Sequence, residues 1–197
     1  MTAVILASQS AARAQILAGA GVAFEKVSAG VDEDLTKARL LEAGETPAVI
    51  AAALAQEKAQ AVSRSRPGLI IGADQTLEFE GQLYDKAASL EEARARLLAL
   101  RGKPHHLHSA VAVAEDGLVI WEELATATLT MRDFSPAFLD DYLAREGADL
   151  LGSVGCYRLE GLGAQLFAEI SGDYFAILGL PLLGLLDLLR DKGVVVR

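Results

Sequence analysis

The chain is poor in cysteine, because Cys156 is the only one among its 197 residues. A single cysteine excludes an internal disulfide and a zinc site built from several thiolates. With its apolar flanks, we expect Cys156 to be buried and unreactive. Prolines are also few, numbering five, whereas hydrophobic residues make up 52% of the chain. This composition argues against extended disorder and supplies a substantial core, so we expect one domain over residues 1–197.

Positive charge is scarce as well. The chain has 18 Lys and Arg against 27 Asp and Glu, which gives a net charge of −9. Non-specific binding to nucleic acid needs a basic surface, so we expect no nucleic-acid partner. An anionic substrate would have to be met by locally placed Lys and Arg, helped by a metal cation.

Long hydrophobic runs are missing too. The most apolar stretch, 176–186, is interrupted by Gly179, Pro181 and Gly184. It falls short of the ~20 apolar residues that a membrane span needs. The chain begins with a short apolar run that no basic segment precedes, which is unlike a secretory signal. We therefore expect a cytoplasmic protein that makes no contact with membranes.

Local sequence patterns predict a mixed α/β fold. Capping residues, helical periodicity and flanking glycines predict helices over residues 11–18, 47–66, 89–100, 136–145 and 182–190. Short apolar or alternating runs predict strands at 4–7, 24–28, the segment entering Asp74, two antiparallel strands within 106–131, and 166–170. Turns are expected at Glu80-Gly81 and Asp116-Gly117, and residues 30–34 are expected to form an acidic loop.

The most informative stretch runs from Ile70 to Lys86 and reads IIGADQTLEFEGQLYDK. Its apolar start stops at Gly72 and places Asp74 at the end of a buried strand, and Lys86 follows beyond a turn. Open α/β sheets hold ligands beyond the carboxyl ends of their strands. A carboxylate there, with a cation returning beside it, suits phosphate chemistry. The alternative is an Asp that caps a turn and a solvated Lys.

A second candidate site lies in LASQSAARAQIL, residues 6–17, where a strand passes through two serines into a helix. The start of a helix offers unpaired N–H groups and a positive dipole end, which hold phosphate well. Ser8, Ser10 and Arg13 would add donors. The alternative is a serine-capped helix with a surface arginine, because no Walker signature is present.

Acidic residues near strand ends suggest a metal site. Magnesium binds through one or two carboxylates together with phosphate oxygens and waters, and Glu33 and Asp74 fit that role. Lys58, on the long helix, is by default a surface residue. The three histidines at 105, 106 and 108 have no acidic or cysteine partner at ligand spacing, so we do not expect them to bind metal.

Together these segments resemble the Maf family of nucleoside triphosphate pyrophosphatases. The resemblance rests on LASQSAARAQIL, VDED, LAQEKA, GADQTLEFEGQLYDK, RGKPHHLHSAVAV and GCYRLEGLGAQLFAEISGDYFAILGLP, which occur in the family's order along nearly the whole chain. It implies a mixed-sheet α/β fold with two lobes around a cleft, related to the ITP pyrophosphatases, and a homodimer.

The resemblance also implies a reaction, hydrolysis between the α- and β-phosphates to a nucleoside monophosphate and pyrophosphate. Asp74 would be the general base that deprotonates water, and Glu33 and Asp74 would bind a divalent metal, Mg or Mn. The triphosphate would be held by Ser8, Ser10, Arg13, Lys58 and Lys86. Fixed cations aimed at phosphate oxygens are usually the largest catalytic term in such reactions.

The chain departs from the family pattern at several positions. Ala11 and Ala12 replace Pro and Arg of a Pro-Arg-Arg motif, and Ala87 replaces the proline that commonly follows Lys86. Gln75 and Glu160 stand where other members have Thr and Gln. These last two resemble the subgroup that hydrolyses 7-methyl-GTP, so Ala12, Gln75 and Glu160 are the expected specificity residues.

Base chemistry supports this subgroup. Guanine presents two adjacent donors, N1–H and N2–H, which a carboxylate accepts together, whereas uracil and thymine match a Gln amide. The alternatives are a dTTP/UTP-preferring or broad pyrophosphatase, and a non-catalytic nucleotide-binding regulator of septum formation. A dinucleotide-binding domain is discarded, because no G-x-G-x-x-G follows the first strand.

Overall fold

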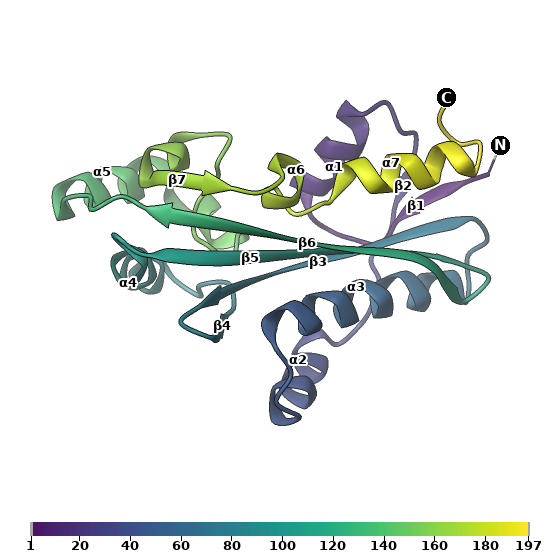
Figure 1. Ribbon diagram of the computed structural model, residues 1–197, viewed down its shortest axis with the longest axis horizontal. Helices are drawn as coiled ribbons and strands as arrows, with labels where there is room; N and C mark the ends of the chain where they lie inside the picture. The colour runs from purple at the N-terminus through teal and green to yellow at the C-terminus, as the bar shows by residue number, and fades with distance from the viewer. Residues whose placement is uncertain (1, 197) are drawn as a thin grey trace.

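The computed structural model describes residues 2–196, whose strands form one mixed seven-stranded sheet in the order β2-β1-β3-β5-β6-β7, with β4 paired to β3 (Figure 1). The strands are β1 (Val4–Leu6), β2 (Glu25–Lys26), β3 (Leu69–Phe79), β4 (Gln82–Tyr84), β5 (Pro104–Glu115), β6 (Leu118–Met131) and β7 (Phe167–Ser171). β1 runs parallel to both neighbours, and the remaining pairs are antiparallel. The predicted mixed sheet is confirmed.

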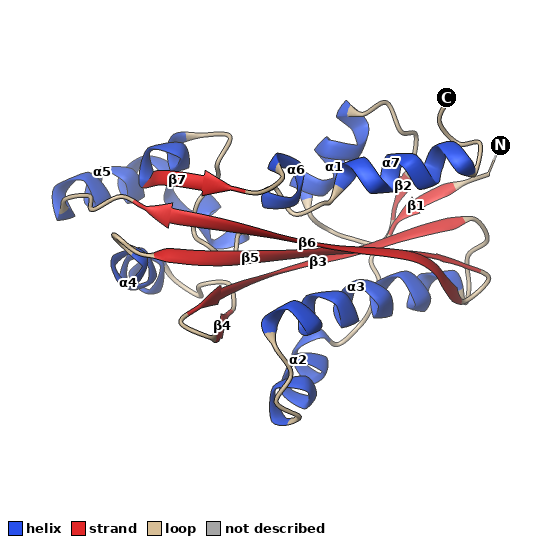
Figure 2. Ribbon diagram, viewed as in Figure 1, coloured by secondary structure: helices blue, strands red, loops and turns tan. Residues whose placement is uncertain are grey.

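Helices lie on both faces of this sheet (Figure 2). They are α1 (Ala11–Gly19), α2 (Glu33–Glu42), α3 (Pro47–Ser63), α4 (Leu90–Leu100), α5 (Pro136–Glu146), α6 (Tyr174–Ile177), α7 (Leu182–Asp191) and the 3-10 segments η1 (Gly147–Gly152) and η2 (Leu162–Leu166). Thr46, Ser89 and Ser135 cap their helices, at the starts expected from the sequence. Within residues 2–196, no helix is both long and apolar enough to cross a membrane.

Two lobes form at opposite ends of the long strands β3, β5 and β6 (Figure 1). One lobe packs α1 and α7 on β1 and β3, around a cluster that includes Leu6, Leu17 and Leu185. The other packs α4 and α5 around Leu97 and Phe134. The expectation of two lobes is therefore confirmed, and the three long strands belong to both of them.

The α3 helix lies unusually close to the sheet because the facing side chains are small. Alanines of α3 pack on alanines of β5, and Gly72 of β3 lies directly under the helix. A Cβ at Gly72 would overlap the backbone of Ala55 and Ala59. This close approach lets the long side chain of Lys58 reach across the sheet surface.

The expectation that a strand ends at Asp74 is wrong, because β3 continues to Phe79. What ends is the neighbouring strand: β1 stops at Leu6, which is paired with Ile71. On its other side Asp74 is paired with Ala110 of β5. Asp74 therefore lies just beyond the carboxyl end of β1, and the short β1 opens a crevice beside a continuous β3.

The expected acidic loop at 30–34 is also corrected, because α2 begins at Glu33. The Asp32 side chain accepts a hydrogen bond from the Leu35 N–H at 3.0 Å, which caps the helix. Acidic residues in the first turn also complement the helix dipole. No helical pattern is visible in this part of the sequence, because only Thr36 of α2 is buried and an apolar stripe is absent.

Candidate active site

A cavity of about 880 Å³ lies between the lobes, lined by the β1–α1 loop, α2, α3, β3, the β4–α4 loop and the segment around η1. All ten residues expected from the sequence to form the site line it: Ser8, Ser10, Ala12, Arg13, Glu33, Lys58, Asp74, Gln75, Lys86 and Glu160. The structure thus gathers into one place residues that are far apart along the chain.

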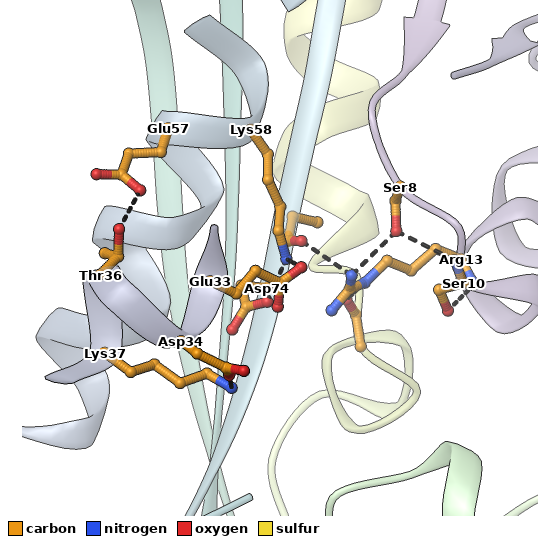
Figure 3. A network of polar contacts seen from close by, with 12 residues as sticks. Ser8, Ser10, Arg13, Glu33, Asp34, Thr36, Lys37, Glu57, Lys58 and Asp74 are labelled. Atoms are coloured by element: carbon orange, nitrogen blue, oxygen red, sulfur yellow. Dashed lines mark hydrogen bonds and ion pairs between the residues drawn. The ribbon is translucent and has the colours of Figure 1, made fainter. Parts of the chain in front are cut away.

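Lys58, which lines this cavity, bridges two carboxylates (Figure 3). Its Nζ lies 2.6 Å from Asp74 Oδ1 and 2.9 Å from Glu33 Oε1. Lys58 and Asp74 are each only 6% exposed, so the surface position expected by default for Lys58 is wrong. A buried carboxylate needs such a partner, because an unpaired charge is expensive to remove from water.

The environment of Glu33 favours its ionised form. Burial by itself would raise the pKa of this carboxyl. The hydrogen bond and charge of Lys58, together with the charges of Lys37 and Lys86, outweigh burial and hold the pKa of Glu33 below its usual value. Glu33 therefore remains an anion through neutral pH, at the mouth of the same cavity as Asp74.

Arg13 is buried in the wall of the cavity rather than at the surface. Its guanidinium donates to the carbonyl oxygen of Gly179 at 2.8 Å, to that of Ala73 at 2.9 Å and to Ser8 Oγ at 3.1 Å. Burial lowers the pKa of Arg13, and the charges of Asp74 and Glu33 oppose that change. Arg13 thus joins α1, β3 and the segment after α6 while it places positive charge beside Asp74.

The start of α1 faces the same cavity, as predicted. Ser10 caps the helix, with its Oγ accepting from the Arg13 N–H at 3.3 Å. Ser8 Oγ accepts from the Ser10 N–H at 3.3 Å as well as from Arg13. The serines thus hold the turn between β1 and α1, at the positive end of the helix dipole.

Two further cations line the cavity from different elements. Lys86, on the β4–α4 loop, is exposed and lines the cavity. Lys37 was missed from the sequence: one turn after Glu33 on α2, it lies 2.6 Å from Asp85 Oδ1. Burial would lower the pKa of Lys37, but the hydrogen bond to Asp85 and the charges of Asp85, Asp74 and Glu33 raise it. Recognising α2 as a helix would have placed Lys37 beside Glu33.

The model of the Maf-like protein family matches residues 3–192. The chain belongs to the Maf family. It is 62% identical to a nucleoside triphosphate pyrophosphatase of Caulobacter vibrioides over 99% of this chain and 98% of the relative. It is 53% identical to another of that name from Granulibacter bethesdensis, covering 95% of each. A 7-methyl-GTP pyrophosphatase of Rhizobium johnstonii is 47% identical over 97% and 96% of the two chains.

The remaining part of this Maf-family cavity is formed by irregular backbone. Glu160 is exposed and lies on the segment between η1 and η2. This segment is attached at its buried Tyr157, whose hydroxyl lies 2.7 Å from His105 Nε2. Burial lowers the pKa of His105 to about 4, so the imidazole is neutral at physiological pH. This buried contact thus helps to anchor the segment that carries Glu160.

Gln75, which was expected from the sequence to be a specificity residue, is bonded to the protein itself in the wall of the cavity. Its Nε2 donates to Ser109 Oγ at 2.8 Å and to the carbonyl oxygens of Ala176 at 3.1 Å and Ile177 at 3.0 Å. The amide nitrogen is thus engaged in holding α6 against β3. A base bound in the cavity would meet the amide oxygen of Gln75.

The residues present fit a divalent metal ion in their donor chemistry. Between residues 2 and 196, no group of three or more His, Cys, Asp or Glu is placed to hold a metal. Glu33 and Asp74, however, converge on one cation, the Lys58 ammonium, so both carboxylates reach a common point. A pair of carboxylates that leaves further positions to phosphate and water is what Mg²⁺ uses.

Proposed function

We propose that this chain hydrolyses nucleoside triphosphates between the α- and β-phosphates, releasing pyrophosphate, and that it favours 7-methyl-GTP. The observation that carries the proposal is one cavity with two kinds of wall. At the buried end of the cavity, Asp74 is surrounded by Lys58, Arg13 and the start of α1. At the exposed end, Glu160 lies on a loop segment. The relatives at 62% and 53% identity bear the name of the general activity.

The buried end supplies the groups for attack at phosphorus. Asp74 accepts the proton of the attacking water, and its 2.6 Å ion pair with Lys58 fixes the direction of the carboxylate. Lys58, Lys86 and the N–H groups at the start of α1 bind phosphate oxygens, on which negative charge gathers during transfer. Arg13 adds positive charge without moving, because its guanidinium is already tied to three protein acceptors.

Glu33 and Asp74 would hold a divalent cation, Mg or Mn, beside the triphosphate. When bound, that ion neutralises charge on the phosphate oxygens. The lowered pKa of Glu33 favours the ionised form of this ligand. Lys58, which bridges the two carboxylates, keeps them close together in the free protein.

The exposed end supports the choice of base. The Glu160 carboxylate can accept from both N1–H and N2–H of guanine. The positive charge of a 7-methylated purine is also attracted to a carboxylate. Uracil and thymine would instead present acceptor oxygens to this carboxylate, and the two would repel each other. The 7-methyl-GTP pyrophosphatase of Rhizobium johnstonii, 47% identical to this chain, supports the same preference.

A broader specificity is the second candidate. The relatives at 62% and 53% identity are named for nucleoside triphosphates in general. Glu160 is exposed on a loop segment, and such a residue discriminates less strictly than one held in a buried pocket.

Kinetics on a nucleotide panel test the proposal. Pyrophosphate release is measured with 7-methyl-GTP, GTP, UTP and dTTP in the presence of Mg²⁺ or Mn²⁺. We expect kcat/KM for 7-methyl-GTP to exceed that for UTP and dTTP by about tenfold or more. Faster turnover of UTP or dTTP would refute the preference, and no pyrophosphate from any nucleotide would refute the hydrolysis and favour a non-catalytic regulator.

A further inference from the structure

The α2 helix is attached to the protein almost wholly by polar contacts. Thr36 is the only buried residue in its ten-residue length. Thr36 Oγ1 donates to Glu57 Oε2 at 2.7 Å, and Arg39 lies 3.6 Å from Glu57 Oε1. The bridge from Glu33 to Lys58 adds a third contact with α3. Since apolar burial contributes little, charged side chains decide where α2 lies.

The α2 helix also contacts the β4–α4 loop, through one ion pair. Lys37 Nζ lies 2.6 Å from Asp85 Oδ1, and the two side chains are 18% and 59% exposed. Asp34, on the same helix, is a weaker competitor at 3.8 Å and is 96% exposed. The Lys37–Asp85 pair thus joins α2 to the β4–α4 loop.

Asp85 is also held through its backbone. The buried Arg96 of α4 donates to the carbonyl oxygens of Asp85 and Val154, the latter at 2.6 Å. The Arg96 guanidinium also lies over the ring of Tyr84, 5.4 Å from its centroid. Asp85 is therefore fixed from two directions, by Arg96 at its main chain and by Lys37 at its side chain.

The next residue, Lys86, has no such support of its own. Its side chain lines the cavity, close enough to Glu33 for its charge to lower the pKa of that carboxyl. It forms no hydrogen bond or ion pair with any residue in the described range 2–196. The position of the Lys86 ammonium therefore depends on the backbone that Asp85 anchors.

We infer that Lys37 and Asp85 form a positioning pair, which holds Lys86 in place to receive the triphosphate before substrate arrives. This inference rests on the proposed role of Lys86 as a phosphate ligand. Groups that are ordered in advance bind more tightly, because less conformational freedom is lost on binding. The pair acts on the phosphate side, so its effect is the same for every nucleotide base.

Lys37 could instead bind phosphate itself, with Asp85 as a competitor for its ammonium. The two roles predict different results for Asp85→Asn. In a positioning pair, loss of either partner weakens substrate binding and loss of both costs no more than loss of one. If Lys37 were a direct ligand, Asp85→Asn would leave binding unchanged or improve it.

The experiment measures kcat and KM for 7-methyl-GTP and UTP in Lys37→Met, Asp85→Asn and the double variant. We expect KM to rise about fivefold in each single variant and no further in the double variant, with kcat changed less than about twofold. Lys37→Arg, which can keep the ion pair, restores most of the loss. Lys103→Met is the matched control, because it breaks an exposed 2.9 Å pair with Glu80 beyond the cavity and leaves KM unchanged.

Titration calorimetry with inorganic pyrophosphate and Mg²⁺ provides a second measurement that needs no turnover. The positioning pair predicts the same fold loss of affinity in both single variants. Unchanged affinity and KM in Asp85→Asn, or effects that add in the double variant, would overturn the inference. The proposed base preference is tested separately, by the ratio of kcat/KM for 7-methyl-GTP and UTP in the wild type. The proposed hydrolysis would be refuted separately if the wild type binds pyrophosphate but releases none from a nucleotide.

Discussion

The two ends of the cavity are built in different ways. At the end around Asp74 the functional side chains come from β3, α3 and α1, and three of them, Arg13, Lys58 and Asp74, are buried and joined to fixed partners. At the other end Glu160 lies exposed on the segment between two 3-10 turns, which is anchored by the contact of Tyr157 with His105.

Under the proposed function, this contrast would separate the chemical step from the choice of substrate. Attack at phosphorus requires groups fixed in place, and buried ion pairs on regular elements provide this at the Asp74 end. Base recognition needs only a few contacts, and a loop segment can change them without disturbing the sheet. We therefore expect changes at the buried end to abolish turnover and changes at the exposed end to alter preference.

The largest effect is expected at the buried end, from Asp74→Asn. Removing the base should lower kcat by about 10³-fold, within the usual range for a positioned base. Nucleotide affinity should fall by a much smaller factor, because one of the two proposed metal ligands is lost and the cations that bind phosphate remain. Single-turnover pyrophosphate release and calorimetric affinity measure the two quantities. Glu78→Gln is the matched control, because it neutralises another carboxylate of β3 that pairs with His108 away from the cavity. Retention of turnover in Asp74→Asn would contradict the assignment of the chemical step to the buried end of the cavity.

A smaller effect that concerns selectivity is expected from Glu160→Gln. The amide replaces one acceptor by a donor, which should disfavour guanine and suit a pyrimidine. We expect the ratio of kcat/KM for 7-methyl-GTP over that for UTP to fall about tenfold, with the sum of the activities little changed. Glu169→Gln on β7, outside the cavity, should leave the ratio as it is. An equal loss for both nucleotides would instead place Glu160 in the chemistry.

The smallest effect on turnover at neutral pH is expected from His105→Gln, which changes the residue that contacts Tyr157 and so anchors the exposed end of the cavity. The pKa of His105 is about 4 in the folded protein and 6.5 for the unperturbed residue. Between these values the unfolded chain binds a proton that the folded chain does not, so the contribution of His105 is complete above pH 6.5 and is lost as pH falls towards 4. The loss amounts to at most about 3 kcal/mol of unfolding free energy.

Urea unfolding at pH 7 and pH 4.5 measures this loss for the wild type and for His105→Gln. The wild type should lose more stability than the variant over this interval. His106→Gln, on the same strand but half-buried, should follow the wild type. Parallel losses in the wild type and His105→Gln would show that the buried imidazole does not govern the acid response.

Most elements of the fold could be predicted because their signals are local. Ser89 and Ser135 cap helices where expected, and Asp116-Gly117 turns between β5 and β6 with both residues at positive φ. The residues that line the cavity could be named from motifs. Their burial could not, since that of Lys58 depends on how closely α3 approaches the sheet through alanines and Gly72.

The features that were missed depend on contacts between distant segments. The α2 helix lacks an apolar stripe, so nothing local indicated it, and Lys37 was overlooked with it. The surroundings of Asp74 were mistaken for the end of a strand because the strand that ends there is its neighbour, β1. Sequence patterns along one segment do not reveal where an adjacent segment stops.

The central claim is that the triphosphate lies at the buried end and the base at the exposed end. A crystal structure of Asp74→Asn with 7-methyl-GTP and Mg²⁺ tests this directly, because the variant should bind substrate without consuming it. We predict the α-phosphate beside residue 74, the metal against Glu33, and the purine edge at Glu160. Phosphates bound away from Asp74 and Lys58, or the base at that end, would contradict the account.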